Sequence, residues 1–367
     1  MNSLDAVVVG AGVFGAWTAL YLRRTGRHVV LVDIYGPGNN RSSSGGESRI
    51  IRMGYGADEI YTRWSMRSLG LWKELFDQTR RSELFQETGV LATPRPGDPR
   101  ALATQTALEN CGVAFDRLTP AELARRFKRL RFREERMGLF EPHSGVLLAR
   151  RAVQAVVEQA VREGVEYRVA KFHRGSDSPN TVVYACGPWM PKIFPEVLGG
   201  RIRVTRQEVF FFGTPAGDLR YAPPAMPVWV DITDEHSAYT IPNIENRGFK
   251  LAFDRHGPEF DPDTGDRVVR DIDQARAFLA ERFPGLAGAP LVESRVCQYE
   301  NTSTGDFLID RHPDFENVWL VGGGSGHGFK HGPAVGEYAC ALIEGKAAVE
   351  PRFSLGTKSR EPQRSVF

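Results

Sequence analysis

The chain has 367 residues, of which 41% are hydrophobic and 25% charged, proportions typical of soluble globular proteins and not of disordered or fibrous ones. Its 47 Lys and Arg against 45 Asp and Glu leave a formal charge of +2, too little for the broad basic surface that nucleic-acid binding requires. We therefore expect no nucleic-acid partner. The four cysteines lie far apart and form no CxxC pair, which favours free thiols in a reducing compartment over a metal site.

The first apolar segment, residues 6–22, has no charged residue and is similar in composition to a signal-peptide core or a short membrane span. Asp5 stands where a signal peptide would begin with basic residues, and three glycines interrupt the segment. We therefore predict a cytoplasmic protein with no membrane segment.

A glycine-rich turn lies between the first predicted strand, DAVVV, and the first predicted helix. A second strand, HVVLVD, ends at Asp33, so a strand, GxGxxG, a helix, a strand and an acid follow one another. The first glycine permits a tight turn, the second lets backbone amides approach a pyrophosphate, and the third lets helix and strand pack closely. The pattern predicts a dinucleotide, FAD or NAD, held by the turn and by a ribose contact: Gly10, Gly12, Val13, Phe14, Gly15 and Asp33.

The rest of the chain alternates between two kinds of sequence pattern. A helical pattern over 151–161 leads to the strand-like segment 182–189, and a strand, a glycine-rich turn and a helix return near the C-terminus. Between them, strand alternation begins at Glu208, Pro227, Ser237 and Gly248, which is typical of an antiparallel sheet. We predict a discontinuous cofactor domain with an inserted substrate domain. The cofactor domain takes 1–80, 141–200 and 298–367, and the substrate domain takes 81–140 and 201–297.

Six motifs, in the same order along nearly the whole chain, resemble those of the FAD-dependent amine oxidases of the monomeric sarcosine oxidase and N-methyltryptophan oxidase group, within the D-amino-acid-oxidase-like superfamily. The motifs are GAGVFG, GGESRIIR, ACGPW, GFKLAF, CQY with FLID, and GSGHGFKHGPAVGE, beginning at Gly10, Gly45, Ala185, Gly248, Cys297 and Gly324. The resemblance implies an α/β fold with a glutathione-reductase-like, FAD-binding Rossmann domain and a substrate domain on a mixed or antiparallel sheet. It also implies a monomer.

The resemblance assigns chemistry to four residues. Cys297 matches the cysteine that binds the flavin covalently, and a thiolate near positive charge suits that bond. Without the resemblance, an ordinary buried cysteine is the default interpretation. Arg52 and Lys330 match two anchors for the substrate carboxylate, the first as a bidentate fork and the second as a point charge. Lys250 matches the lysine that activates oxygen at the flavin face, where fixed positive charge stabilises developing superoxide.

Further positions follow from the same resemblance. His327 is expected at the flavin's pyrimidine edge, with a simple capping histidine as the alternative, and Tyr239 and Tyr299 match residues that line the substrate cavity. The remaining expected cofactor contacts are Ser44, Arg49, Val169, Gly187, Trp189, Gly324, Gly326, Gly328, Phe329 and Lys330. Val169 is the expected adenine contact in a stretch, 165–181, that is shorter than in the family.

Two positions depart from the family's pattern. Gly45 and Asp254 stand where the sarcosine oxidases carry histidines, which predicts a roomier and more anionic pocket than one for sarcosine. We therefore expect oxidation of a secondary amino acid larger than sarcosine, N-methylated or cyclic, to an imine, with oxygen reduced to hydrogen peroxide. The alternatives are a flavoprotein dehydrogenase that passes electrons to a protein partner and a nicotinamide-dependent dehydrogenase.

Overall fold

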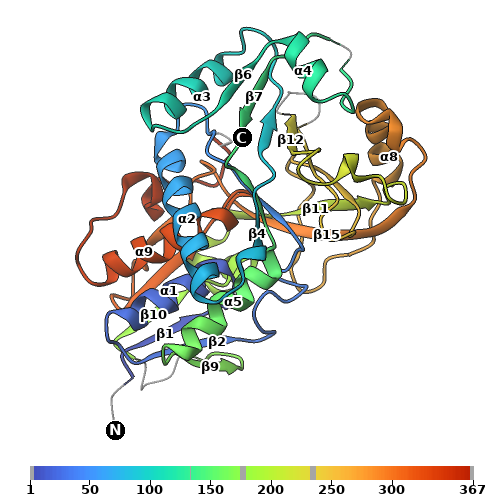
Figure 1. Ribbon diagram of the computed structural model, residues 1–367. Coiled ribbons are helices and arrows are strands. Elements are labelled where there is room, and N and C mark those ends of the chain that lie inside the picture. The colour runs from blue at the N-terminus through green and yellow to red at the C-terminus, as the bar shows by residue number, and fades with distance from the viewer. Residues whose placement is uncertain (1–3, 133, 174–178, 232–236, 364–367) are drawn as a thin grey trace.

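The computed structural model describes residues 4–132, 134–173, 179–231 and 237–363 (Figure 1). Two large sheets organise these residues, and a small antiparallel sheet joins them in the order β3-β8-β4. The small sheet is formed by β3 (Arg49–Ile51), β4 (Phe85–Gln86) and β8 (Gly145–Leu147). This mixture of a parallel-type sheet and a second, mixed sheet confirms the expected α/β class.

The first large sheet has six strands in the order β16-β17-β10-β1-β2-β9. All neighbouring pairs are parallel except β16 with β17. The strands are β1 (Ala6–Val9), β2 (Val29–Asp33), β9 (Glu166–Val169), β10 (Thr181–Tyr184), β16 (Leu308–Arg311) and β17 (Val318–Gly322). β1, β2, β10 and β17 are almost entirely buried and rich in valine, as strands covered on both faces should be.

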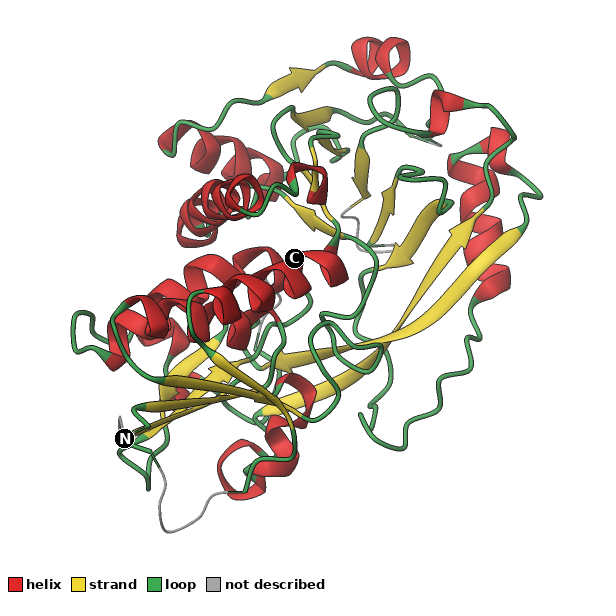
Figure 2. Ribbon diagram, turned by 60° about the horizontal axis from the view of Figure 1, so that its bottom comes forward, coloured by secondary structure: helices red, strands yellow, loops and turns green. Residues whose placement is uncertain are grey.

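Helices cover one face of this sheet (Figure 2). α1 (Val13–Arg24) packs against α5 (Ala149–Arg162) and α9 (Gly332–Ile343), and α9 in turn packs against α2 (Glu59–Gln78). α1 is buried over most of its surface, and its only charges are two arginines in its last turn, where the helix dipole favours them. Every helix in the described part of the chain is too short or too polar to span a bilayer.

The second large sheet has eight strands in the order β15-β11-β14-β13-β12-β5-β7-β6, antiparallel except where β12 meets β5. The strands are β5 (Val90–Ala92), β6 (Asp116–Leu118), β7 (Gly138–Glu141), β11 (Ile202–Phe212), β12 (Val228–Asp231), β13 (Ala238–Ile241), β14 (Phe249–Phe253) and β15 (Leu291–Thr302). The remaining helices are α3 (Pro99–Asn110), α4 (Pro120–Arg126), α6 (Met190–Ile193), α7 (Pro195–Leu198) and α8 (Ile272–Arg282).

Some of the predicted domain limits do not coincide with the ends of structural elements. β15 continues from 291 to 302, across the expected limit at 297, and β4 of the expected substrate segment pairs with β8 of the expected cofactor segment. The two-domain division stays a prediction, and two of its limits, after residues 140 and 297, fall inside the strands β7 and β15. Residues Ile232 and Thr233, which were expected to prolong β12, lie outside the described residues.

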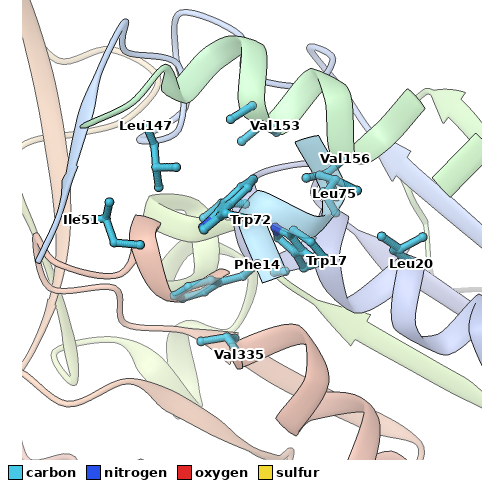
Figure 3. Packing of buried hydrophobic residues seen from close by; sticks show 14 of the residues in the cluster. Phe14, Trp17, Leu20, Ile51, Trp72, Leu75, Leu147, Val153, Val156 and Val335 are labelled. Carbon is cyan, nitrogen blue, oxygen red and sulfur yellow. The ribbon is translucent and has the colours of Figure 1, made fainter. Parts of the chain in front are cut away.

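A buried aromatic core fixes the C-terminal glycine-rich turn against the helices (Figure 3). Trp17 of α1 and Trp72 of α2 meet edge to face with ring centroids 5.2 Å apart. The Trp72 ring also stacks on Phe329, and its Nε1 donates to the Lys330 carbonyl oxygen at 3.0 Å. Because both tryptophans are at most 1% exposed, the position of Lys330 is set by the core and not by a surface loop.

Candidate active site

A cavity of about 640 Å³, here called the nucleotide cavity, lies at the carboxyl ends of the parallel strands β1, β2, β10 and β17. Ligands of open α/β sheets bind at this edge, and the volume is within the range of cofactor sites. The cavity brings together the predicted cofactor positions Gly10, Gly12, Val13, Phe14, Asp33, Ser44, Arg49, Gly187, Trp189, Cys297, Gly324, Gly326, Gly328 and Phe329.

The glycine turn after β1 has the close approaches that its sequence predicts. Gly10 has φ +105°, and a Cβ there would lie 2.4 Å from the Ala185 carbonyl oxygen. A Cβ at Gly15 would lie 1.9 Å from the Gly10 carbonyl oxygen, so only glycine lets α1 pack this close to the turn. The buried Ser44 hydroxyl accepts from the Val13 backbone N–H at 3.1 Å and ties a distant loop to the start of α1.

Asp33 lies in the nucleotide cavity with its carboxylate already engaged by backbone donors. Oδ2 accepts from the Ala11 N–H at 2.8 Å, and Oδ1 accepts from Tyr35 and Gly36 at 2.7 and 2.8 Å. A carboxylate offers about four acceptor positions, so one remains for a ribose hydroxyl. The residue therefore fits the expected contact and also holds the turn in shape.

The expected adenine contact needs correction. Val169 is 64% exposed on β9, an edge strand, and is not among the described residues that line the nucleotide cavity. The cavity wall is formed instead by the next three residues, Ala170, Lys171 and Phe172. Which of these residues would contact the adenine stays a prediction. Residues 174–178 of this shortened stretch lie outside the described residues.

Glu300 is a functional candidate that the sequence reasoning missed. It is 8% exposed on β15 and lines the nucleotide cavity, and its Oε1 accepts from the Gly324 N–H at 3.3 Å. Its Oε2 is buried, and none of the residues that the structure describes forms a hydrogen bond to it. Burial raises the pKa of Glu300 to about 7, against the opposing effect of backbone N–H donors at Gly324 and Gly323. The available sequence signal was its position next to Tyr299 in the motif that begins at Cys297.

Glu300 should make stability depend on pH. Its folded-state pKa is raised above the ordinary 4.5, so the folded protein holds a proton that the unfolded chain releases, and stability falls as pH rises between these values. We expect Glu300→Gln to gain stability over wild type by on the order of 2 kcal/mol between about pH 5 and about pH 8. Urea unfolding of the apoprotein at both pH values measures this. A difference that is the same at both would show that Glu300 ionises normally.

A smaller cavity of about 110 Å³, here called the inner cavity, lies between the eight-stranded sheet and the glycine-rich turn. Several residues line both cavities, so the two are contiguous: Ser42, Arg49, Cys297, Gln298, Tyr299, Gly326 and Phe329. The inner cavity also brings together the predicted catalytic residues Gly45, Arg52, Tyr239, Lys250, Asp254, His327 and Lys330. A space of this size holds a few water molecules or a compact amino acid.

Cys297 lies where the two cavities meet. Its Sγ is 3.7 Å from Arg49 Nη2, and Arg49 is anchored by Nη bonds to the carbonyl oxygens of Ser43 and Ser48 at 2.6 and 2.8 Å. The Cys297 sulfur therefore lies beside a guanidinium that two backbone carbonyl groups hold in place.

Arg52 and Lys330 meet on Tyr55, a second residue that the sequence reasoning missed. The Arg52 guanidinium lies 4.7 Å from the Tyr55 ring centroid, and Lys330 Nζ donates to the Tyr55 hydroxyl at 2.6 Å and to the His327 carbonyl oxygen at 3.0 Å. Burial and the nearby Arg52 lower the pKa of Lys330. An anion between the two cations would restore the lysine's charge, which suits a carboxylate. No local pattern marks Tyr55.

Lys250 extends from β14 and is 2% exposed. Its Nζ donates to the Ser48 carbonyl oxygen at 3.0 Å and lies 5.5 Å from the Tyr239 ring centroid. Burial and the Arg49 charge lower the pKa of Lys250. Tyr239 pairs with Ala252 across β13 and β14, so the strand register sets the tyrosine beside the lysine.

Asp254 follows β14 and accepts from the Tyr299 hydroxyl at 2.9 Å. Burial raises the pKa of Asp254, while the Tyr299 hydrogen bond and Arg52 oppose the change. The carboxyl group places a titratable acid in the cavity that Arg52 and Lys330 also line.

Glycine occupies position 45 for a different reason from the one expected. A Cβ at Gly45 would lie 1.8 Å from the Asn39 carbonyl oxygen, so a side chain here would point into the backbone of its own loop. In this loop conformation the glycine is required by packing and does not leave an emptied part of the pocket. Asp254 alone then supports the expected difference from a sarcosine pocket.

His327 is 2% exposed, and its ring is held by protein groups on both sides. Its Nε2 lies 3.0 Å from the Gly305 carbonyl oxygen and its Nδ1 lies 3.4 Å from the Tyr55 hydroxyl. The ring also stacks on Phe307 with centroids 4.7 Å apart. These contacts indicate that the ring helps to hold the turn in position. The His327 carbonyl oxygen accepts from Lys330 beside the inner cavity.

Comparison with known proteins agrees with this geometry. Residues 5–342 match the family model described as "DAO: FAD dependent oxidoreductase". The chain is 32% identical to a monomeric sarcosine oxidase of Bacillus sp. (strain B-0618), covering 92% of this chain and 91% of that protein. It is 27% identical to the N-methyl-L-tryptophan oxidase of Citrobacter koseri, covering 96% of each. L-proline dehydrogenase from P. horikoshii has a similar fold, with a TM-score of 0.82, 19% identity and coverage of 96% and 97%.

Proposed function

Since the chain belongs to the DAO family of FAD dependent oxidoreductases, we propose that it oxidises a secondary amino acid at its C–N bond to an imine, with oxygen as the electron acceptor. The relatives named above carry the names of sarcosine and N-methyltryptophan oxidases, which supports the substrate class. One observation carries the proposal: two cations converge in a small cavity contiguous with the nucleotide cavity. Membership of an FAD family disfavours the nicotinamide alternative.

The residues fit FAD. The glycine turn, Ser44 and Asp33 would hold its nucleotide part, and Arg49, Cys297 and Phe329 line the junction where its ring would lie. When bound, FAD supplies the two-electron acceptor chemistry that no amino-acid side chain offers. Cys297, with the Arg49 guanidinium at 3.7 Å, would form the covalent thioether.

The chain's own part is to bind and orient the substrate. Arg52 and Lys330 would hold its carboxylate, and Asp254 with Tyr299 would face its amino group. With the carboxyl, amine and reacting carbon all fixed, only one carbon-bound hydrogen is presented for transfer. Asp254 is the carboxyl group placed to face the amine, and it already accepts the Tyr299 hydroxyl at 2.9 Å, so we expect the substrate's own deprotonation to govern the rate. The pH dependence of the rate should therefore follow the pKa of the substrate's amine.

Covalent attachment is tested by acid precipitation. We expect yellow colour to stay with the precipitated wild-type protein and to remain in the supernatant for Cys297→Ala, because only the wild type has a thiol beside Arg49. Cys340→Ala is the matched control, since that cysteine is buried in the aromatic and aliphatic core outside both cavities. Flavin released from the wild type would remove the covalent bond and leave FAD binding intact.

One panel of candidate substrates tests both the size of the substrate and the identity of the electron acceptor. Asp254 supports a substrate with a polar or cationic group, and we propose one larger than sarcosine, N-methylated or cyclic. Peroxide release is measured for sarcosine, larger N-methyl amino acids and cyclic amino acids. Preference for sarcosine would contradict the size proposal. Turnover with artificial electron acceptors but without oxygen consumption would favour the dehydrogenase that passes electrons to a protein partner.

A further inference from the structure

Glu300 brings a buried carboxyl group to the wall of the nucleotide cavity. The side chain is 8% exposed, and its Oε1 accepts from the Gly324 N–H at 3.3 Å. Oε2 is buried, and no donor in the described part of the chain forms a hydrogen bond to it. A buried acceptor without a partner is costly unless a bound molecule supplies the donor. The carboxyl group therefore points to a ligand with a hydrogen-bond donor.

Three glycines make room for this carboxyl group at the ends of β10 and β17. A Cβ at Gly322 would lie 3.3 Å from Glu300 Oε2, and a Cβ at Gly324 would lie 3.4 Å from Oε1. A Cβ at Gly187 would lie 3.9 and 4.0 Å from the two oxygens. The Glu300 backbone is fixed as well, because its carbonyl oxygen accepts from the Ser325 N–H at 3.0 Å. The carboxyl group is thus held at the sheet edge where ligands of such folds bind.

The position of Glu300 separates it from the substrate. Cys297 and Tyr299 on the same strand line both the nucleotide cavity and the inner cavity, whereas Glu300 lines only the nucleotide cavity. Burial is the largest cause of its raised pKa, and no charged side chain of the described residues is among the causes. A phosphate group here would place like charges side by side without a neutralising cation. The expected ligand group is therefore neutral.

The chemistry of the lining residues assigns the parts of FAD along the cavity. Asp33 suits the ribose of the adenosine half, and the glycine turn at the start of α1 suits the phosphates. Cys297 lies at the junction of the two cavities, where the ring would lie. The ribityl chain joins the phosphates to the ring and carries uncharged hydroxyl groups, which are hydrogen-bond donors. It is the part of FAD that these assignments leave without a protein partner.

We propose that Glu300 binds FAD through a hydroxyl group of the ribityl chain, which donates to Oε2. The hydroxyl group supplies the donor that the carboxyl group lacks, and it adds no charge to a poorly hydrated position. Glu300 would then hold the flexible part of the cofactor between the phosphates and the ring. The inference rests on the proposed function only in that FAD is the bound cofactor, and it does not depend on the substrate.

Reversible FAD binding is measured in the full chain with Cys297→Ala, so that no covalent bond traps the cofactor. Glu300→Gln and Glu300→Leu are added to this background, and Kd is obtained by titrating each apoprotein with FAD and following flavin fluorescence. We expect Kd to rise about tenfold in Glu300→Leu, which loses the acceptor. Glu300→Gln should stay within about threefold of the background, because its amide oxygen can accept from the same hydroxyl group.

Glu293→Leu is the matched control. Glu293 lies on the same strand as Glu300, pairs with Arg247 at 2.7 Å and lines neither the nucleotide cavity nor the inner cavity. This substitution should leave Kd for FAD unchanged. Urea unfolding shows whether each variant is folded before it is titrated, and Glu300→Met provides the same test if Glu300→Leu does not fold.

FAD analogues that each lack one hydroxyl group of the ribityl chain locate the contact. One analogue should bind the Cys297→Ala protein about tenfold more weakly than FAD does, and Glu300→Leu should weaken the binding of that analogue no further. The other analogues should show the same loss in Glu300→Leu as FAD itself. This pattern would couple Glu300 to one hydroxyl group, which a general effect of the substitution on the fold would not do.

Two results would overturn the ribityl contact. One is a Glu300→Leu protein that binds FAD as tightly as the background, and the other is an equal loss for FAD and for every analogue. Neither would affect the proposed function, which requires only that FAD binds and that the substrate reduces it. Failure of the wild type to bind FAD would instead contradict the proposed function, so the two failures are distinguishable.

Discussion

Replacing Arg52 or Lys330 by methionine should lower kcat/KM for amino-acid substrates by about 100-fold to 1,000-fold, because each loss leaves a partly buried carboxylate with one fewer charged partner. Arg52 lies over the Tyr55 ring and Lys330 donates to its hydroxyl, so both cations are held in place before the substrate arrives. Methionine keeps an apolar stem and removes the charge and, at Lys330, the hydrogen bonds to the Tyr55 hydroxyl and the His327 carbonyl oxygen. Steady-state kinetics with the best substrate of the panel measures the loss.

A substrate without a carboxylate distinguishes carboxylate binding from a general effect on the fold. The corresponding N-methyl amine should react slowly with the wild type and lose little further activity in Arg52→Met and Lys330→Met. Arg63→Met is the matched control, since Arg63 is exposed on α2 and pairs with Glu59 at 2.9 Å. Equal losses for the amino acid and the amine would mean that the two cations support the fold and do not bind the carboxylate.

Lys250→Met should slow reoxidation of the reduced enzyme by about 100-fold to 1,000-fold, the effect of removing one preorganised charge from a site where negative charge develops. Anaerobic reduction by substrate should remain within a few-fold of the wild type. Lys250 is 2% exposed and its Nζ is held by the Ser48 carbonyl oxygen, so its charge acts in a poorly hydrated position. Stopped-flow mixing with oxygen separates the two half-reactions.

The pH dependence of reoxidation tests whether the charged form of Lys250 accelerates this step. Burial and Arg49 lower the pKa of Lys250, so raising the pH through that value removes the positive charge and should slow the wild type. Lys250→Met should show no such decline in this step. A Lys250→Met variant that is reoxidised at the wild-type rate would assign oxygen activation to another group, and Arg49 would be the next cation to replace.

The N-terminal unit of β1, α1 and β2 was predictable because several local signals coincide there. The valine-rich β1, the glycine turn and the acid at the end of β2 each specify the same unit, and the structure places Gly10 and Gly15 in the close contacts that the pattern requires. The core positions of α5 and the strand β14 were similarly readable from their periodicity. The continuity of β15 through Cys297 was not, because the predicted domain limit was placed at the motif that begins there.

Residues of the candidate site were predictable only where they lie in a recognisable sequence motif. Cys297, Lys250 and Lys330 come from three distant motifs, and the structure brings all of them around one cavity. Glu300 was missed because an acid in a strand usually faces solvent, and its burial depends on the turn at Gly324 that lies far along the chain. The exposure of Val169 likewise depends on where an edge strand ends, which no local pattern fixes.

An anaerobic titration tests most directly whether a secondary amino acid transfers electrons to a flavin bound in the cavities that Cys297 and Lys250 line. The FAD-loaded protein is mixed with the substrate panel in the absence of oxygen, and oxygen is then admitted. We predict that a secondary amino acid bleaches the yellow flavin absorbance and that oxygen restores it with one peroxide released per flavin. A flavin whose absorbance is unchanged by every secondary amino acid, while another class of donor bleaches it, would contradict the proposed function.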